Sequence, residues 1–117
     1  MSNQNVSIGN QSGTAVTTGD DNVMVGHQAG ASLQTGTENT IIGSGANAGA
    51  VGAHNQTAIG MNCTAVNTDD SVTIGNNDVT NIYMSQDKDA VVHSSYHQID
   101  NYTDQTSIGP GANANIV

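Results

Sequence analysis

The sequence predicts an all-β fold, a parallel β-roll or β-solenoid with coils of about 17 residues. The first observation behind this prediction is a hydrophobic residue followed by glycine that returns along the chain. The pairs are Ile8-Gly9, Val25-Gly26, Ile42-Gly43, Ile59-Gly60, Ile74-Gly75 and Ile108-Gly109. Successive glycines of these pairs lie 17, 17, 17, 15 and 34 residues apart, and the last spacing is twice 17. A fixed period of this length is typical of repeat architectures.

The second observation is that each pair ends a short alternating segment whose outer residues are β-branched. The segments are Val6-Ser7-Ile8, Val23-Met24-Val25, Thr40-Ile41-Ile42, Thr57-Ala58-Ile59, Val72-Thr73-Ile74 and Thr106-Ser107-Ile108. Alternation with a period of two predicts short strands, and we expect their uniform outer positions to be the packed face. The six glycines that follow are expected structural positions, because each supplies an unusual backbone angle or a close approach.

The third observation is that small residues alternate in the second half of the period. They are Ala29, Ala31, Ala46, Ala48, Ala112 and Ala114. This pattern predicts a second strand in each coil, with coils stacked about 4.8 Å apart by parallel ladders. Val, Ile, Leu and Phe make up only 21 of 117 residues, which suits a thin inner slot. Because such a coil buries one layer, we expect identical faces of several copies to meet.

The repeats divide the chain into three parts. Residues 1–75 form the repeats, residues 76–104 an irregular excursion or degenerate coil, and residues 105–117 a terminal repeat. The excursion concentrates aromatic, histidine and lysine side chains, which are typical of contact surfaces. The expected contact residues are Tyr83, Lys88, His93, Tyr96, His97 and Tyr102. These residues could contact either a neighbouring subunit or an outside partner, and the sequence does not decide between the two.

The charge excludes several classes of partner. Ten acidic residues against one basic residue give a net charge of −9. Nucleic-acid binding depends on Lys and Arg, and so does attachment to anionic membranes, so we expect neither. No stretch has the length and apolarity of a transmembrane helix. The first residues show neither the basic region nor the apolar core of a secretion signal, so we expect assembly in a cytoplasm.

No catalytic, metal or cofactor site is expected. The acids Asp20-Asp21, Glu38 and Asp69-Asp70 fall in corresponding turns, where solvated carboxylates are favoured over Ca²⁺ ligands. Cys63 takes the place of alanine in other coils and is expected to be a buried small residue. One alternative is not excluded by the sequence: a symmetric oligomer could gather copies of one histidine around its axis. The Gly-rich runs lack the following helix that a phosphate-binding loop requires.

Together these segments resemble known repeats. Asn39-Thr40-Ile41-Ile42-Gly43, followed by Gly45-Ala46-Asn47-Ala48, resembles the head repeats of trimeric autotransporter adhesins. The longer period, with Gly26-His27-Gln28-Ala29-Gly30, is more similar to repeats of bacteriophage tail-fibre and virion-appendage proteins. The resemblance covers roughly residues 5–75 and 105–116. It implies a homotrimer, intertwined or side by side, and transfers no catalytic residues.

The resulting functional hypothesis is a structural fibre or appendage protein of a phage virion that contributes to host-surface recognition, and not an enzyme. Its expected partners are copies of itself, other virion proteins and a host receptor, at the surface of the particle. A capsid decoration or connector protein is the alternative. An ice-binding β-solenoid is a minor alternative. It is disfavoured because the threonines are scattered along the chain and because Thr40 and Thr57, which do align, are expected to face inward.

Overall fold

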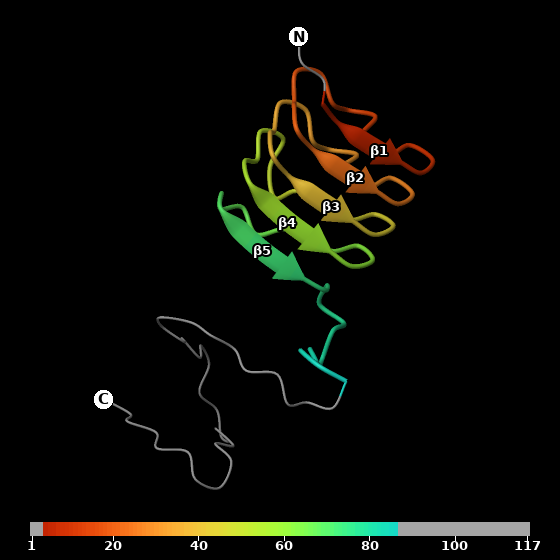
Figure 1. The fold of residues 1–117 in the computed structure, drawn as a ribbon, viewed down its shortest axis with the longest axis vertical. Coiled ribbons are helices and arrows are strands. Elements are labelled where there is room, and N and C mark those ends of the chain that lie inside the picture. The colour runs from red at the N-terminus through yellow and green to blue at the C-terminus, as the bar shows by residue number, and fades with distance from the viewer. Residues whose placement is uncertain (1–3, 87–117) are drawn as a thin grey trace, which may run out of the picture. The chain divides into compact units, whose positions relative to one another are not determined.

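A computed structural model of the chain describes residues 4–86, none of which lies in a helix. Residues 6–74 of this part form a parallel β-solenoid. Five strands follow one another: β1 (Val6–Ile8), β2 (Val23–Val25), β3 (Thr40–Ile42), β4 (Gln56–Ile59) and β5 (Ser71–Ile74). They form one sheet in the order β1-β2-β3-β4-β5, and a loop closes each coil behind it (Figure 1). The expected all-β solenoid is confirmed. The chain divides into two units, Met1–Ile82 and Tyr83–Val117, and the solenoid belongs to the first.

The register of the sheet follows the sequence period. Each strand pairs in parallel with the next, so that Val23 lies beside Thr40 and Thr40 beside Thr57, both 17 residues further along. The last step is shorter and pairs Thr57 with Val72. The glycine after each strand extends the ladder, since Gly43 N donates to Val25 O over 2.8 Å. Coils therefore stack through backbone hydrogen bonds that need no particular side chain.

The second half of the coil differs from the prediction, because no second strand forms there among the described residues. Only isolated bridges occur, between Thr37 and His54 and between Asn47 and Thr64. The reason lies in the backbone, which turns into the left-handed region at Gln28 (φ 57°) and at Gly30 (φ 65°). Neighbouring coils still exchange hydrogen bonds in this half, but an extended strand cannot continue through such angles.

The core is a thin layer inside the coils, and β2, β3 and β4 each contribute one inward residue to it. Met24, Ile41 and Ala58 are fully buried. Small residues face them from the second half of the coils, namely Ala29, Ala46 and Cys63. The expectation that the outer strand positions pack inside the coil was wrong. Side chains alternate across a strand, and the single inward position of a three-residue strand is the middle one.

An amide ladder runs along the stack where the strands begin: Asn22 and Asn39 directly precede β2 and β3, and Gln56 is the first residue of β4. Asn22, Asn39 and Gln56 are buried, and the Oδ1 atom of each asparagine accepts from the backbone N of the next residue in the ladder. Asn39 Nδ2 also donates to Asn22 Oδ1 at 2.9 Å and to Ala53 O at 2.7 Å. The coil that follows Gln56 is two residues shorter. The longer Gln56 side chain reaches the carbonyls of Val66 and Thr68 there.

The glycine after each strand allows the coils to approach closely. Gly26 has φ 137°, and a Cβ atom placed on it would lie 2.5 Å from the carbonyl oxygen of Gly43 in the next coil. The same arrangement recurs one coil on, between Gly43 and Gly60. Both the backbone angle and the space therefore require glycine at this point of the period.

Candidate functional site

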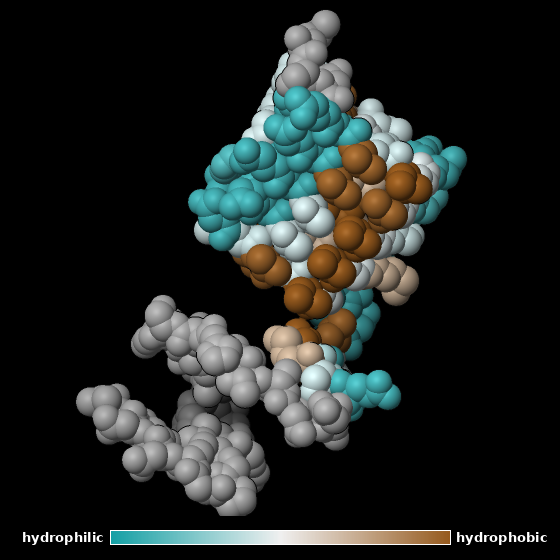
Figure 2. Space-filling view, in the orientation of Figure 1, coloured by the Kyte–Doolittle hydropathy of each residue, from teal (hydrophilic) through white to brown (hydrophobic). Residues whose placement is uncertain are grey.

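The most distinctive surface of the solenoid is the outer side of its sheet, which we call the strand face. It consists of the two outward residues of each strand: Val6, Ile8, Val23, Val25, Thr40, Ile42, Thr57, Ile59, Val72 and Ile74. Parallel pairing aligns them in two rows, one before and one after the buried middle residue. In Figure 2 the brown hydrophobic side chains run from strand to strand along the sheet.

The strand face is exposed although eight of its ten residues are aliphatic. Ile8 is 59% exposed and Val72 is 68% exposed, and Ile42 and Ile59 are each 38% exposed. None of the ten residues carries a charge. A contiguous apolar patch of this kind is typical of an interaction surface, whereas single exposed hydrophobic residues are not.

Two threonines of the strand face correct an expectation from the sequence. Thr40 and Thr57 pair side by side in the sheet, and they lie on the outward side, because their neighbours Ile41 and Ala58 are the buried residues. Their outward position removes one of the two reasons for which the ice-binding alternative was disfavoured. They are nevertheless two of ten residues on an otherwise aliphatic face, which therefore presents no extended ranks of threonine.

The two edges of the strand face differ in charge. The acidic edge, at the last two positions of each coil, contains Asp20, Asp21, Glu38, Asp69 and Asp70. The opposite edge follows the glycine after each strand and contains Asn10, His27, Ser44, Met61 and Asn76, with a carboxylate, Asp78, beside Asn76 in the turn after β5. The acidic edge is a row of turns, since Asp21, Glu38 and Asp70 have φ angles near +60°.

Histidine and acidic side chains of the acidic edge form hydrogen bonds and one ion pair. His54 Nε2 lies 3.4 Å from Glu38 Oε2, and both side chains are about half exposed. His54 Nδ1 also lies 2.9 Å from Thr37 Oγ1, and His54 N donates to Asp69 Oδ1. An exposed pair of this kind contributes little to stability. No group of three or more His, Cys, Asp or Glu side chains suited to a metal ion occurs among residues 4–86.

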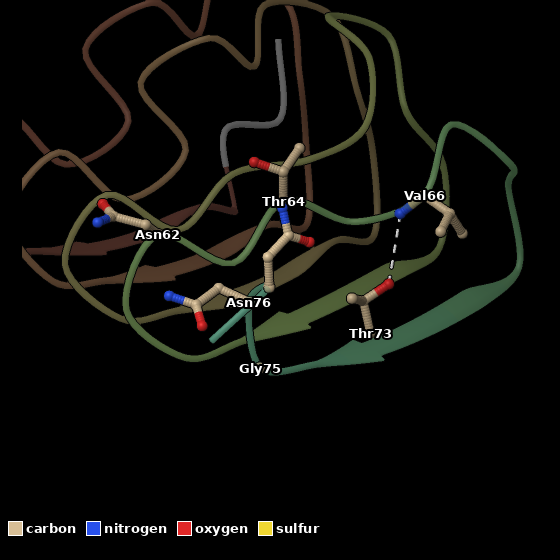
Figure 3. A pocket seen from close by; sticks show the side chains of 7 residues that line it. Asn62, Thr64, Val66, Thr73, Gly75 and Asn76 are labelled. Carbon is tan, nitrogen blue, oxygen red and sulfur yellow. Dashed lines mark hydrogen bonds between the residues drawn. The ribbon is translucent and has the colours of Figure 1, made fainter. Parts of the chain in front are cut away.

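A hollow of about 410 Å³ lies beside the last strand, lined by Asn62, Thr64, Val66, Thr73, Gly75, Asn76 and Asn77. Figure 3 shows that these residues come from the loop after β4 and from β5 and the turn after it. Thr73 Oγ1 accepts from Val66 N at 3.3 Å. The lining provides amides and hydroxyls but no titratable side chain. It therefore supplies neither a general base nor an activated nucleophile.

Of the six contact residues expected from the sequence, Tyr83 lies within the described residues. Tyr83 is 66% exposed. Lys88, His93, Tyr96, His97 and Tyr102 lie outside the described residues, as does Gly109. The other five expected structural glycines, Gly9, Gly26, Gly43, Gly60 and Gly75, follow β1 to β5 in order and all have positive φ.

Cys63 is a free, fully buried thiol, as expected from its place in the period. Its Sγ atom contacts Thr73 O at 3.6 Å. Burial among small apolar residues is typical of a structural cysteine and not of a nucleophile.

The strand face and the amide ladder are the two features that the reasoning from sequence missed. The face was assigned to the interior of the coil, although its lack of charge was visible. The amide ladder has a plain signal, because Asn5, Asn22 and Asn39 stand 17 residues apart.

Comparison with known protein families, with curated proteins and with solved structures finds no match for this chain. Within residues 4–86 there is also no helix of the length and apolarity needed to cross a membrane.

Proposed function

We propose that this chain is a structural component of a fibre or appendage of a phage virion, and that several copies associate to form a stiff rod, with a homotrimer as the expected state. The observation that carries the association of copies is the exposed, charge-free strand face. A surface of this extent is unfavourable in water and favourable between copies. The place in a phage virion rests on the resemblance of the repeats to those of virion appendages.

The rest of the described solenoid supports a structural role over a catalytic one. The buried amides are hydrogen-bonded within the stack, and no buried side-chain nitrogen or oxygen among the described residues lacks a partner. The hollow beside β5 has no titratable side chain in its lining. The buried polar groups of residues 4–86 thus maintain the stack, which supports a structural role.

Within this proposal the excursion at residues 76–104 contributes to recognition of a host surface. It contains all three tyrosines of the chain, Tyr83 among them. Several copies on one rod raise the effective concentration of a weak contact, so that a modest affinity per copy suffices. The alternative, a capsid decoration or connector protein, differs in its partner, which is another virion protein.

A cell-binding assay tests this proposal. Fluorescently labelled protein is mixed with a panel of bacterial cells, and the bound fraction is counted by flow cytometry. Saturable binding to some strains, reduced at least fivefold by Tyr83→Ala combined with Tyr96→Ala, is expected. The exposed Asn67→Ala outside the excursion is the matched control. Binding to phage particles and to no cells would instead indicate the decoration role, and binding to neither would contradict both.

Light scattering tests the expected oligomeric state. The chain has a mass of 11.9 kDa, and we expect about three times this value in solution. A stable dimer or a larger ring would contradict the trimer without affecting the cell-binding result.

A further inference from the structure

The end of the solenoid beside β5 combines a hollow with backbone groups that the earlier coils pair with the coil after them. We propose that this end is a binding site for an extended, uncharged peptide segment with small side chains at alternate positions, of the sequence type Gly-Ala-Asn-Ala. This inference goes beyond the proposed function, because it assigns a ligand to a surface that neither the strand face nor host recognition uses.

The first step is the pairing in the second half of the coils. Asn47 of the third coil and Thr64 of the fourth form an isolated parallel bridge. Asn47 N donates to Cys63 O at 2.8 Å, and Asn47 O accepts from Ala65 N at 3.0 Å. In such a bridge the N and O of Thr64 itself are directed away from Asn47, to the side on which a further coil would stack. Neither atom forms a hydrogen bond with another residue of the described range 4–86.

The second step is that backbone groups on both sides of Thr64 have side-chain partners. Met61 O accepts from Asn76 Nδ2 at 3.1 Å. Val66 N donates to Thr73 Oγ1 at 3.3 Å. The donor and acceptor of Thr64 thus lie between two capped groups, and they have the arrangement that a bridge to one more extended residue requires. Extended peptides are recognised through backbone hydrogen bonds of this kind.

The third step is the room beside these atoms. The hollow of about 410 Å³ is lined by Thr64 on one side and by Thr73 and Gly75 of the β5 side on the other (Figure 3). No residue of its lining carries a charge. A charged side chain that entered the hollow would lose water without gaining an opposite charge, so the site favours an uncharged segment.

The third coil shows which side chains suit the segment. Ala46 and Ala48 are buried on either side of Asn47, and they belong to the same core cluster as Ile41. Larger side chains at these two positions would overpack a thin core. A segment that pairs with Thr64 would stand in the same relation to β5, and therefore needs small residues two positions apart. The sequence Gly-Ala-Asn-Ala meets this condition, and it occurs at residues 45–48 and 111–114.

Amide hydrogen exchange followed by NMR tests the inference. The probe is a synthetic peptide with the sequence of residues 42–49, Ile-Gly-Ser-Gly-Ala-Asn-Ala-Gly, added to the 117-residue chain. At about ten times its dissociation constant the peptide should slow exchange of the Thr64 amide about tenfold, because the site is then free about a tenth of the time. A control peptide with leucine in place of both alanines should leave the exchange unchanged.

Two proline variants test the backbone contact. Thr64→Pro removes the N–H that would donate to the peptide, and should weaken binding about tenfold. Asn67→Pro is the matched control, because it lies in the same loop but outside the lining of the hollow, and it should bind the peptide like the unchanged chain. Neither amide has a hydrogen-bond partner within residues 4–86, so neither substitution removes a bond of the described fold. If circular dichroism shows that Thr64→Pro does not fold, exchange at Thr64 in the unchanged chain still decides.

The source of the segment is tested by repeating the titration with Ala112→Leu combined with Ala114→Leu, because residues 109–114 share the Gly-x-Gly-Ala-Asn-Ala pattern of the probe. Tighter binding to this double variant would show that the chain's own repeat sequence competes for the site. Equal binding would indicate a segment from another protein, and both results support the site. No binding to either protein, or binding that leaves Thr64 exchange unchanged, would overturn the inference. Cell binding and solution mass are measured independently, so such a failure would leave the proposed function standing.

Discussion

Asn39 uses every hydrogen-bonding group of its side chain within the stack. Its Nδ2 donates to Asn22 Oδ1 and to Ala53 O, and its Oδ1 accepts from Gln56 N at 2.9 Å. The side chain is 1% exposed, so water cannot replace these partners. A buried polar group that loses its partner costs more than a typical hydrogen bond contributes. The amide ladder therefore stabilises the fold and also fixes which coil lies next to which.

Replacing Asn39 by alanine tests this role. Asn39→Ala leaves Gln56 N and Ala53 O without their side-chain partner, and we expect a loss of about 3 kcal/mol in the free energy of unfolding. Asn39→Asp keeps the shape but replaces the donor by an oxygen, and should be comparably damaging at neutral pH. Urea unfolding followed by circular dichroism measures both. The exposed Asn67→Ala is the control, and equal stability of the three variants would contradict the ladder's role.

At the scale of the element, each strand is only three or four residues long and depends on its neighbours. The turn that follows it is as specific as the strand. Gly43 has φ 136°, and a Cβ atom there would collide with the carbonyl of Gly60 in the next coil. Glycine is thus required at this position for two reasons. The local backbone angle favours glycine, and the next coil lies too close to leave room for a Cβ atom.

We predict that Gly43→Ala lowers the free energy of unfolding by about 2 kcal/mol or more, since both strain and a backbone collision arise. Gly52→Ala is the matched control. Its φ lies outside the left-handed region, and its Cβ would meet only Thr35 Oγ1, at 3.1 Å. At such a position alanine is tolerated or slightly stabilising. Chemical denaturation of the two variants compares them, and a Gly43→Ala protein as stable as Gly52→Ala would refute the close-approach argument.

The elements also show how far the sequence predicts the structure. Fixed spacing and alternation predicted the strands and the glycine turns, because these depend on residues within one period. The side of the strand that is buried was predicted wrongly. Val23, Met24 and Val25 are all apolar, so period two alone cannot decide which of them points inward. The small volume available opposite Met24, next to Gly30, is visible only when the coil has closed.

The prediction of a second strand in each coil was wrong for a related reason. Alternating small residues predicted a strand, but positive φ angles at Gln28 and at Gly30 interrupt it. Gln28 has no Cβ branching or side-chain chemistry that favours the left-handed region, so its conformation follows from the shape of the coil and not from its own preference. Local propensity cannot supply that information.

At the scale of the whole molecule, an internal layer of mostly small residues stabilises the solenoid only modestly. Its buried hydrophobic residues include six alanines and one leucine: Ala29, Ala46, Ala48, Ala53, Ala58, Ala65 and Leu33. Larger aliphatic side chains, such as Ile8 and Ile74, lie instead on the strand face. Met24, Leu33 and Ile41 are the large hydrophobic side chains that are buried inside. A chain that keeps many of its other large hydrophobic groups outside depends on association to bury them. Folding and assembly should then be coupled.

This coupling predicts that stability depends on protein concentration. If copies associate through the strand face, each tenfold increase in concentration should add about 1 kcal/mol per chain to the free energy of unfolding, and the thermal midpoint should rise accordingly. Thermal unfolding by circular dichroism over a hundredfold range of concentration measures this. Ile42→Asp should abolish the dependence and lower the midpoint, whereas Val51→Asp should preserve it. A midpoint that is independent of concentration in the unchanged protein would mean that the solenoid is stable alone, and that its aliphatic face is tolerated in water.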